Sequence, residues 1–141
     1  MRKKLILVLA GAAMFAVSPA HAQGHKKNEA RDMMRELGAG LSGKALEKAI
    51  AEAEKSPLGS KQNPVRENQP EGQQRYLARL RCTDGSRPEF DRAGNVGEGV
   101  YGYIVDLYKV TCKGQSAVEV YIDMYHDGPE NRPIPAFTIV E

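Results

Sequence analysis

Apolar and polar residues alternate with a period of two along much of the C-terminal half of the chain, and this pattern predicts β-strands. The clearest run is 118–125, in which the even-numbered positions are apolar and face inward while the odd-numbered ones face outward. Residues 103–112 are apolar on both faces, which indicates a central, covered strand. Alternation over 75–82 predicts another strand, and two shorter ones are expected at 88–93 and 136–140.

The segments between these strands are rich in glycine, proline and polar residues. Residues 59–74 are polar, with two prolines and two glycines, and are interpreted as a linker that leads into the fold. Residues 94–102 are interpreted as a glycine-rich loop, and the six residues from Gly94 to Gly99 lack the lysine and the strand–helix context of a phosphate-binding loop. Residues 126–135 form a proline-rich loop that we expect to be rigid.

Helical patterns occupy the region before the linker. Residues 28–37 and 42–55 are both predicted to be helical. In the second, Ser42 is a plausible N-cap, and Leu46, Ala49, Ile50 and Ala53 form a narrow apolar stripe. Residues 23–75 contain no aromatic residue, so we do not expect the segment 23–62 to fold alone. It either packs lightly on the rest of the chain, stays partly flexible, or binds a partner.

The first 22 residues have the pattern of a secretory signal peptide. A basic start (Arg2, Lys3, Lys4) precedes a short apolar run, and a small-x-small cleavage site ends at Ala22. The sequence therefore predicts a periplasmic or secreted protein, with no membrane span in the mature chain. We divide the chain into a cleaved signal peptide (1–22), a helical segment with linker (23–62) and a β-rich domain (63–141).

Removing the signal peptide changes the charge of the protein. The whole chain carries 20 basic and 18 acidic residues, but three of the basic ones lie in the signal peptide, so the mature chain has a formal net charge of −1. A chain of this charge gives no electrostatic reason to bind nucleic acid.

The chain has two cysteines, Cys82 and Cys112, and both follow the signal peptide. In an oxidising compartment an even pair is typical of a disulfide, whereas the distance between them in sequence does not fit a redox-active Cys-x-x-Cys motif. The fold class that follows is α+β: a small, mostly antiparallel sheet of four or five strands, with N-terminal helices and one disulfide.

His126 is the only histidine after the N-terminal segment, and Asp123 precedes it by three positions. A histidine with a carboxylate can act as a general base, so these two are the weak catalytic candidates. No nucleophile motif stands near them, and an ordinary surface histidine or a ligand contact are the alternatives. The residues proposed for binding are the outward arginines and the outward positions of 118–126: Arg79, Arg81, Tyr121, Asp123, Tyr125 and His126. If their strands are neighbours, we expect the arginines to pair with acidic residues across the sheet.

The sequence gives only a weak indication of metal binding. Cleavage after Ala22 would expose Gln23, Gly24 and His25, whose amine, amide and imidazole nitrogens suit Cu(II) or Ni(II) in square-planar geometry. Chance placement of the histidine is the simpler explanation, and cyclisation of the terminal glutamine would remove the amine. We therefore expect no cofactor.

Taken together, these features favour a non-enzymatic binding module that recognises a protein or glycan of the cell envelope. An inhibitor of an envelope hydrolase would fit, with the loop 126–135 inserted into the active site of the enzyme. One alternative is a small hydrolase centred on His126 and Asp123. Another is an envelope structural protein whose helical segment docks on a larger assembly.

Overall fold

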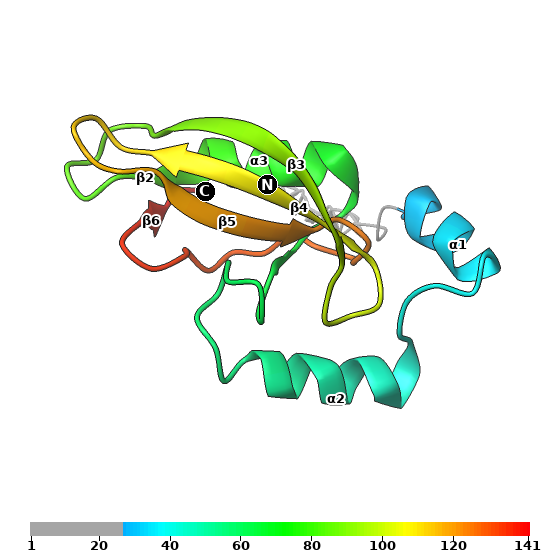
Figure 1. Cartoon of the computed structure of the whole chain (residues 1–141). Helices are drawn as coiled ribbons and strands as arrows, with labels where there is room; N and C mark the ends of the chain where they lie inside the picture. Colours follow the sequence, from blue (N-terminus) through cyan, green and yellow to red (C-terminus); the bar gives the residue numbers. More distant parts are fainter. Residues whose placement is uncertain (1–26) are drawn as a thin grey trace, which may run out of the picture.

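The computed structural model describes residues 27–141 (Figure 1). The signal peptide and the Gln23–His25 metal site predicted above lie outside these residues. The first two elements are the helices α1 (Glu29–Glu36) and α2 (Gly43–Ala53), and both were predicted. Ser42 is the N-cap of α2, although its side chain makes no capping hydrogen bond.

Four strands form the main sheet: β1 (Val65–Arg66), β3 (Glu89–Glu98), β4 (Ile104–Thr111) and β5 (Val118–Asp123). Their order is β1-β5-β4-β3, with β1 parallel to β5 and the other pairs antiparallel. A second, two-stranded sheet pairs β2 (Leu80–Arg81) with β6 (Thr138–Ile139). The predicted α+β class with a mostly antiparallel sheet is therefore confirmed.

The predicted strand at 75–82 and the predicted linker at 59–74 are largely wrong, because a third helix occupies this region. Helix α3 runs from Gln69 to Arg79, and only Leu80–Arg81 is extended. Asn68 is its N-cap, and a proline lies in its first turn, where its missing N–H would have had no partner within the helix. The polar stretch before it supplies strand β1, whose Val65 is fully buried.

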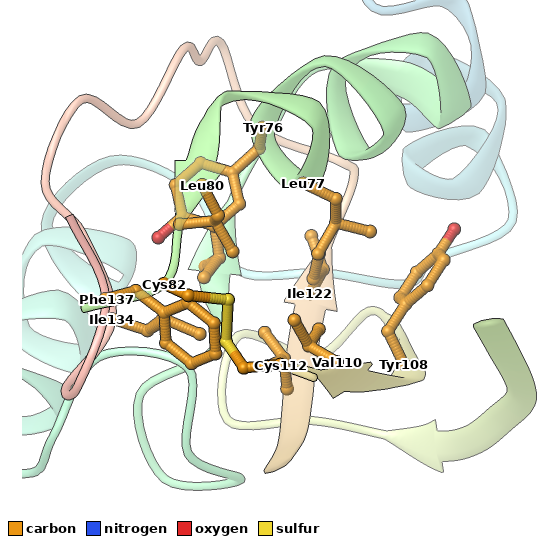
Figure 2. Packing of buried hydrophobic residues seen from close by; sticks show 12 residues of the cluster. Tyr76, Leu77, Leu80, Cys82, Tyr108, Val110, Cys112, Ile122, Ile134 and Phe137 are labelled. Carbon is orange, nitrogen blue, oxygen red and sulfur yellow. A yellow bond between two sulfur atoms is a disulfide. The ribbon is translucent and has the colours of Figure 1, made fainter. Parts of the chain in front are cut away.

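The main core lies between α3 and one face of the sheet (Figure 2). Tyr76, Leu77 and Leu80 are fully buried and pack on residues of β4 and β5 such as Val110 and Ile122. Burying one aliphatic or aromatic side chain contributes about 1.5–3 kcal/mol. This layer therefore provides the apolar burial that fixes α3 on the sheet.

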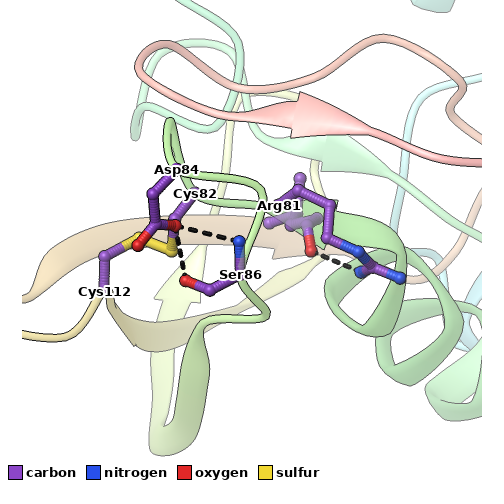
Figure 3. Close-up of a disulfide and its surroundings, with 6 residues drawn as sticks. Arg81, Cys82, Asp84, Ser86 and Cys112 are labelled. Atoms are coloured by element: carbon purple, nitrogen blue, oxygen red, sulfur yellow. Dashed lines mark hydrogen bonds between the residues drawn. A yellow bond between two sulfur atoms is a disulfide. The ribbon is translucent and has the colours of Figure 1, made fainter.

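The predicted disulfide between Cys82 and Cys112 is present and spans 30 residues (Figure 3). Cys82 follows β2 and Cys112 follows β4, so the bond joins the end of the small sheet to the main sheet. Next to it the chain turns at Asp84, whose carboxylate accepts hydrogen bonds from the backbone N–H (2.9 Å) and the hydroxyl (2.6 Å) of Ser86.

A second apolar cluster holds the N-terminal helices on the other parts of the fold. Its buried members are Ala53, Tyr101, Tyr103 and Tyr125, and the predicted apolar stripe of α2 packs against them. Residues 94–102 are not the simple glycine-rich loop that was expected, because β3 continues to Glu98 with irregular pairing after Arg92. Within residues 27–141, no helix is long and apolar enough to cross a membrane.

Candidate functional site

The most distinctive surface feature is the loop 126–135 between β5 and β6, which we call the proline loop. Asp127, Gly128, Pro129, Asn131, Arg132 and Pro133 are exposed in it, whereas His126 and Ile134 at its two sides are buried. Residues from or beside all three helices and β1 make hydrogen bonds and ion pairs with this loop. Contacts between parts of the chain that are distant in sequence therefore fix its geometry.

Glu67 is a buried residue that bonds to the backbone in the middle of the proline loop. It follows β1 and is only 1 % exposed, and its carboxylate accepts a hydrogen bond from the backbone N–H of Glu130 at 2.9 Å. Burial raises the pKa of Glu67, and its hydrogen bonds with the backbone oppose this rise. A Cβ at Gly128 would lie 2.9 Å from this carboxylate, and Gly128 has φ +42°. The close approach of the loop to Glu67 therefore requires glycine there.

Helix α3 holds the same loop at three further atoms. The hydroxyl of Tyr76 donates to the carbonyl of Arg132 at 2.9 Å. The guanidinium of Arg79 donates to the side-chain oxygen of Asn131 at 2.9 Å and to the carbonyl of Glu130 at 3.4 Å. The same guanidinium also donates to the carbonyl of Val140 at 3.0 Å. Arg79 thus joins the proline loop to the C-terminal strand.

An ion-pair network connects the end of α2 to the loop. Arg132 donates two hydrogen bonds to the carboxylate of Glu54, at 2.7 and 3.0 Å, and also pairs with Glu130. Arg66 of β1 contacts the same Glu54 at 2.7 Å. These two guanidinium groups lower the pKa of Glu54 to about 2. Because two nitrogens of Arg132 bond to the two oxygens of Glu54, the contact fixes the orientation of the guanidinium as well as attracting it.

Asn28 and Arg31 fix the first residues of the loop to the N-terminal helix. The side-chain amide of Asn28, which is fully buried, donates to the carbonyls of Met124 (2.8 Å) and His126 (3.0 Å). Its oxygen accepts from the backbone N–H of Arg31 at 2.9 Å and so caps α1. Arg31 in turn pairs with Asp127. α1 and the proline loop are therefore linked at both backbone and side-chain level.

The structure brings the two weak catalytic candidates together, but inside the protein. His126 Nε2 lies 3.3 Å from Asp123 Oδ2, and the two residues are 7 % and 0 % exposed. Tyr101 and Tyr103 meet the imidazole edge-on, with ring centroids at 4.9 and 6.0 Å. The interpretation of His126 as a surface residue is wrong, because the tyrosine cluster and Asn28 cover it. The pair is therefore shielded from solvent in this structure.

The residues predicted for binding do not form one surface. Arg79 reaches the proline loop, whereas Arg81 donates to the nearby carbonyls of Ala78 and Leu80. Tyr121 lies on the sheet with its hydroxyl donating to Glu119 at 3.2 Å. Asp123 and Tyr125 were expected to face outward, but both are buried at the end of β5 with His126.

The expected pairing of arginines with acidic residues across the sheet is also wrong. β2, which contains Arg81, pairs with β6, whereas β5 pairs with β4 and β1. The strand with the acidic residues, β5, therefore does not lie next to β2 or α3 in a sheet. Arg79 instead bonds to the proline loop and to the carbonyl of Val140.

Sequence reasoning missed the residues that support the loop from below, namely Asn28, Glu54, Glu67 and Tyr76. Glu54 and Glu67 are charged residues, and nothing in their local sequence marks them as buried or paired across the fold. Asn28 alone carried a signal, because an asparagine directly before a helical pattern is a typical N-cap.

The described residues offer no metal site: no group of three or more His, Cys, Asp or Glu in 27–141 is placed to hold an ion. Comparison with known proteins adds no relative, since no protein-family model, no curated protein and no solved structure matches the chain.

Proposed function

We propose that this protein is a non-enzymatic binding module of the cell envelope, and that the proline loop is its binding element. One observation carries the proposal: an exposed loop is held in a single geometry by buried or half-buried side chains from distant parts of the chain. Glu67, Tyr76 and Arg79 all bond to this loop. Binding loops that are ordered beforehand lose little conformational entropy when they bind, and this raises affinity.

The shape and chemistry of the loop favour an enzyme as the partner. It is an exposed segment with three prolines (Pro129, Pro133 and Pro135), whose rings fix φ and leave few backbone conformations. Arg132 is half exposed and already oriented by Glu54 and Glu130. A rigid exposed loop with an oriented arginine suits insertion into the concave active site of a hydrolase. We therefore propose inhibition of an envelope hydrolase as the activity of the module.

The signal peptide and the disulfide support the proposed location in the periplasm or outside the cell. The bond between Cys82 and Cys112 is consistent with folding in an oxidising compartment. Both a muramidase and a peptidase of the envelope are partners that such a protein would meet there.

A small hydrolase is the second candidate, and the 3.3 Å approach of His126 to Asp123 favours it. The two functions respond differently to His126→Ala. An enzyme centred on this residue would lose its turnover, whereas the proline loop would keep most of its affinity for a partner.

The proposed function is tested with a substitution at the exposed tip of the loop. Asn131→Tyr adds a bulky side chain there and leaves the bond between Glu67 and the backbone of Glu130 in place. Gln115→Tyr makes the same change at an exposed turn between β4 and β5 and serves as the matched control. Asn131→Ala removes the oxygen that accepts from Arg79 without adding bulk, and so separates loss of that bond from steric blocking.

Each variant is added to an envelope extract of the source organism, and muramidase and peptidase activities are measured. We expect the unchanged protein, Gln115→Tyr and Asn131→Ala to inhibit one of these activities, and Asn131→Tyr to inhibit it at least tenfold more weakly. The proposal is wrong if no activity is inhibited, or if Asn131→Tyr inhibits as well as the control.

A further inference from the structure

A shallow groove of about 610 Å³ runs along one side of α2, and no residue of the proline loop lines it. Helix α2 lies at the outside of the molecule (bottom of Figure 1). Its residues Ala45, Lys48, Ala49 and Glu52 line the groove, and Val100 of the loop between β3 and β4 also lines it. Val100 is 41 % exposed, so a branched apolar side chain stands partly in solvent at the groove.

The chemistry of this groove suits an apolar helix better than a small molecule. Its lining is mostly apolar, because alanines provide much of the wall and Val100 adds a branched side chain. Small-molecule sites add a few convergent polar groups from the protein interior, whereas the charged residues of this groove, Lys48, Glu52 and Lys55, are all exposed. Alanine side chains allow the axes of two helices to approach closely, since the distance between packed helices depends on the side chains at the contact.

The charges along the groove are complementary to those of the same helix in reversed direction. Lys48 and Glu52 lie one turn apart, about 6 Å along the axis, and both are exposed. Lys48 has no ion-pair partner among the residues that the structure describes, and Glu52 contacts only Lys55. If a second α2 lies antiparallel with residue 50 at the centre, Lys48 of each copy faces Glu52 of the other.

We propose that this groove is the interface of a symmetric homodimer, in which α2 of one copy packs antiparallel on α2 of the other. A two-fold axis brings the same patch of both copies together, so each complementary contact occurs twice. The arrangement also covers the exposed side of Val100 in both copies. The proposal rests on α2 alone and does not depend on the proposed role of the proline loop.

The symmetry makes a charge exchange the sharpest test. Lys48→Glu places two carboxylates opposite each other at both ends of the interface, and Glu52→Lys places two ammonium groups there. Each single variant should weaken the dimer roughly tenfold, because two surface ion pairs are lost and replaced by repulsion. The double variant with both substitutions restores opposite charges at every contact and should dimerise like the original protein.

Two further variants complete the experiment. Lys44→Glu changes the net charge by the same amount on the same helix, but Lys44 does not line the groove, so the dimer should be unaffected. Val100→Asp places a charge on the opposite wall of the groove and should weaken the dimer. The fold of every variant is checked by circular dichroism.

Dimerisation is measured by sedimentation equilibrium of the full mature chain over a range of protein concentrations at low salt. We expect a reversible dimer whose dissociation constant rises for each single groove variant and returns in the double variant. A monomer at every concentration overturns the proposal. So does a dimer that Lys48→Glu leaves unchanged, or one that the double variant does not restore.

Discussion

The carboxylate of Glu67 accepts a hydrogen bond from the backbone N–H of Glu130 across 63 positions of sequence, in a place where Glu67 is 1 % exposed. A buried carboxylate is costly unless its oxygens are bonded, so this contact restricts where the proline loop can lie. The relationship connects a residue of the scaffold directly to the proposed binding element.

Replacing Glu67 separates its charge from its hydrogen bond. Glu67→Ala leaves the N–H of Glu130 without its acceptor and should lower the free energy of unfolding by about 1–3 kcal/mol. Glu67→Gln keeps an acceptor oxygen at the same place and should retain most of that stability. Urea unfolding at pH 5 measures both variants. Equal losses in the two would show that the hydrogen bond with Glu130 contributes little.

The raised pKa of Glu67 also predicts a dependence of stability on pH. Because the folded protein holds this proton to higher pH than the unfolded chain does, the contribution of Glu67 to stability falls as pH rises above the ordinary value of 4.5. Glu67→Gln cannot titrate, so the difference in unfolding free energy between Glu67→Gln and the original protein should shift in favour of Glu67→Gln from pH 4.5 to pH 7. A difference that stays constant over this range contradicts the raised pKa.

The contribution of Glu54 to stability depends on pH in the opposite direction. Its pKa is lowered to about 2 by Arg132 and Arg66, so its contribution to stability is present above its ordinary value of 4.5 and is lost as pH falls toward 2. Arg132→Ala should destabilise the protein at pH 7 by about 0.5–1 kcal/mol, since the pair is partly exposed and screened by solvent. The effect should shrink below pH 2.5 and at high salt. Carboxyl NMR should show the pKa of Glu54 rising in this variant, and no rise would mean that Arg132 does not cause the shift.

The contacts of Asn28 should contribute to the attachment of α1 to the rest of the fold. No residue of α1 is fully buried, and Ala30 and Met34 pack only partly buried against the second apolar cluster, so the buried polar contacts of Asn28 add substantially to its docking. Asn28→Ala removes both the cap of α1 and the two bonds to Met124 and His126, whereas Asn28→Asp keeps an oxygen for the cap but cannot donate.

Hydrogen exchange of the amides of 29–36 measures this attachment. In both variants of Asn28 we expect these amides to exchange faster, because their free energy of opening falls by about 1–2 kcal/mol. The amides of β4 and β5 should stay protected. Equal loss of protection throughout the fold would show that α1 and the sheet unfold together. Protection kept in Asn28→Asp would assign the docking to the cap alone.

The N-terminal helices and the strands β4 and β5 were predictable because their apolar periods are local. The stripe of α2 and the alternation in β4 and β5 each follow from neighbouring residues, and the two cysteines left one intramolecular pairing. Helix α3 was missed because Tyr76, Leu80 and Cys82 also fit a period of two. The same region fits a helix when Gln73, Tyr76, Leu77 and Leu80 are taken as positions i, i+3, i+4 and i+7. Asn68 and the following proline marked its start.

The candidate site was less predictable, since its parts meet only in the folded chain. The proline loop was recognised by composition, but Glu67 and Asn28 become important through contacts across 63 and 98 positions. Burial of His126 and Asp123 has the same origin, because the residues that cover them come from α1 and from the segment before β4. Local patterns do not carry this information.

The disulfide gives the last prediction. Closing a loop of 30 residues restricts the unfolded chain and should contribute about 3–4 kcal/mol to the free energy of unfolding. The double variant Cys82→Ser, Cys112→Ser should therefore unfold at a lower urea concentration, with its free energy of unfolding reduced by that amount. A reducing agent should lower the stability of the original protein but not that of the variant. Cys82 and Cys112 lie at the β2 and β4 ends of the core, far from the contacts of α1, so the exchange rates of 29–36 should change less than those of β2 and β6. If removal of the disulfide costs less than about 1 kcal/mol, the unfolded chain is already compact without it and the entropic account does not hold for this protein.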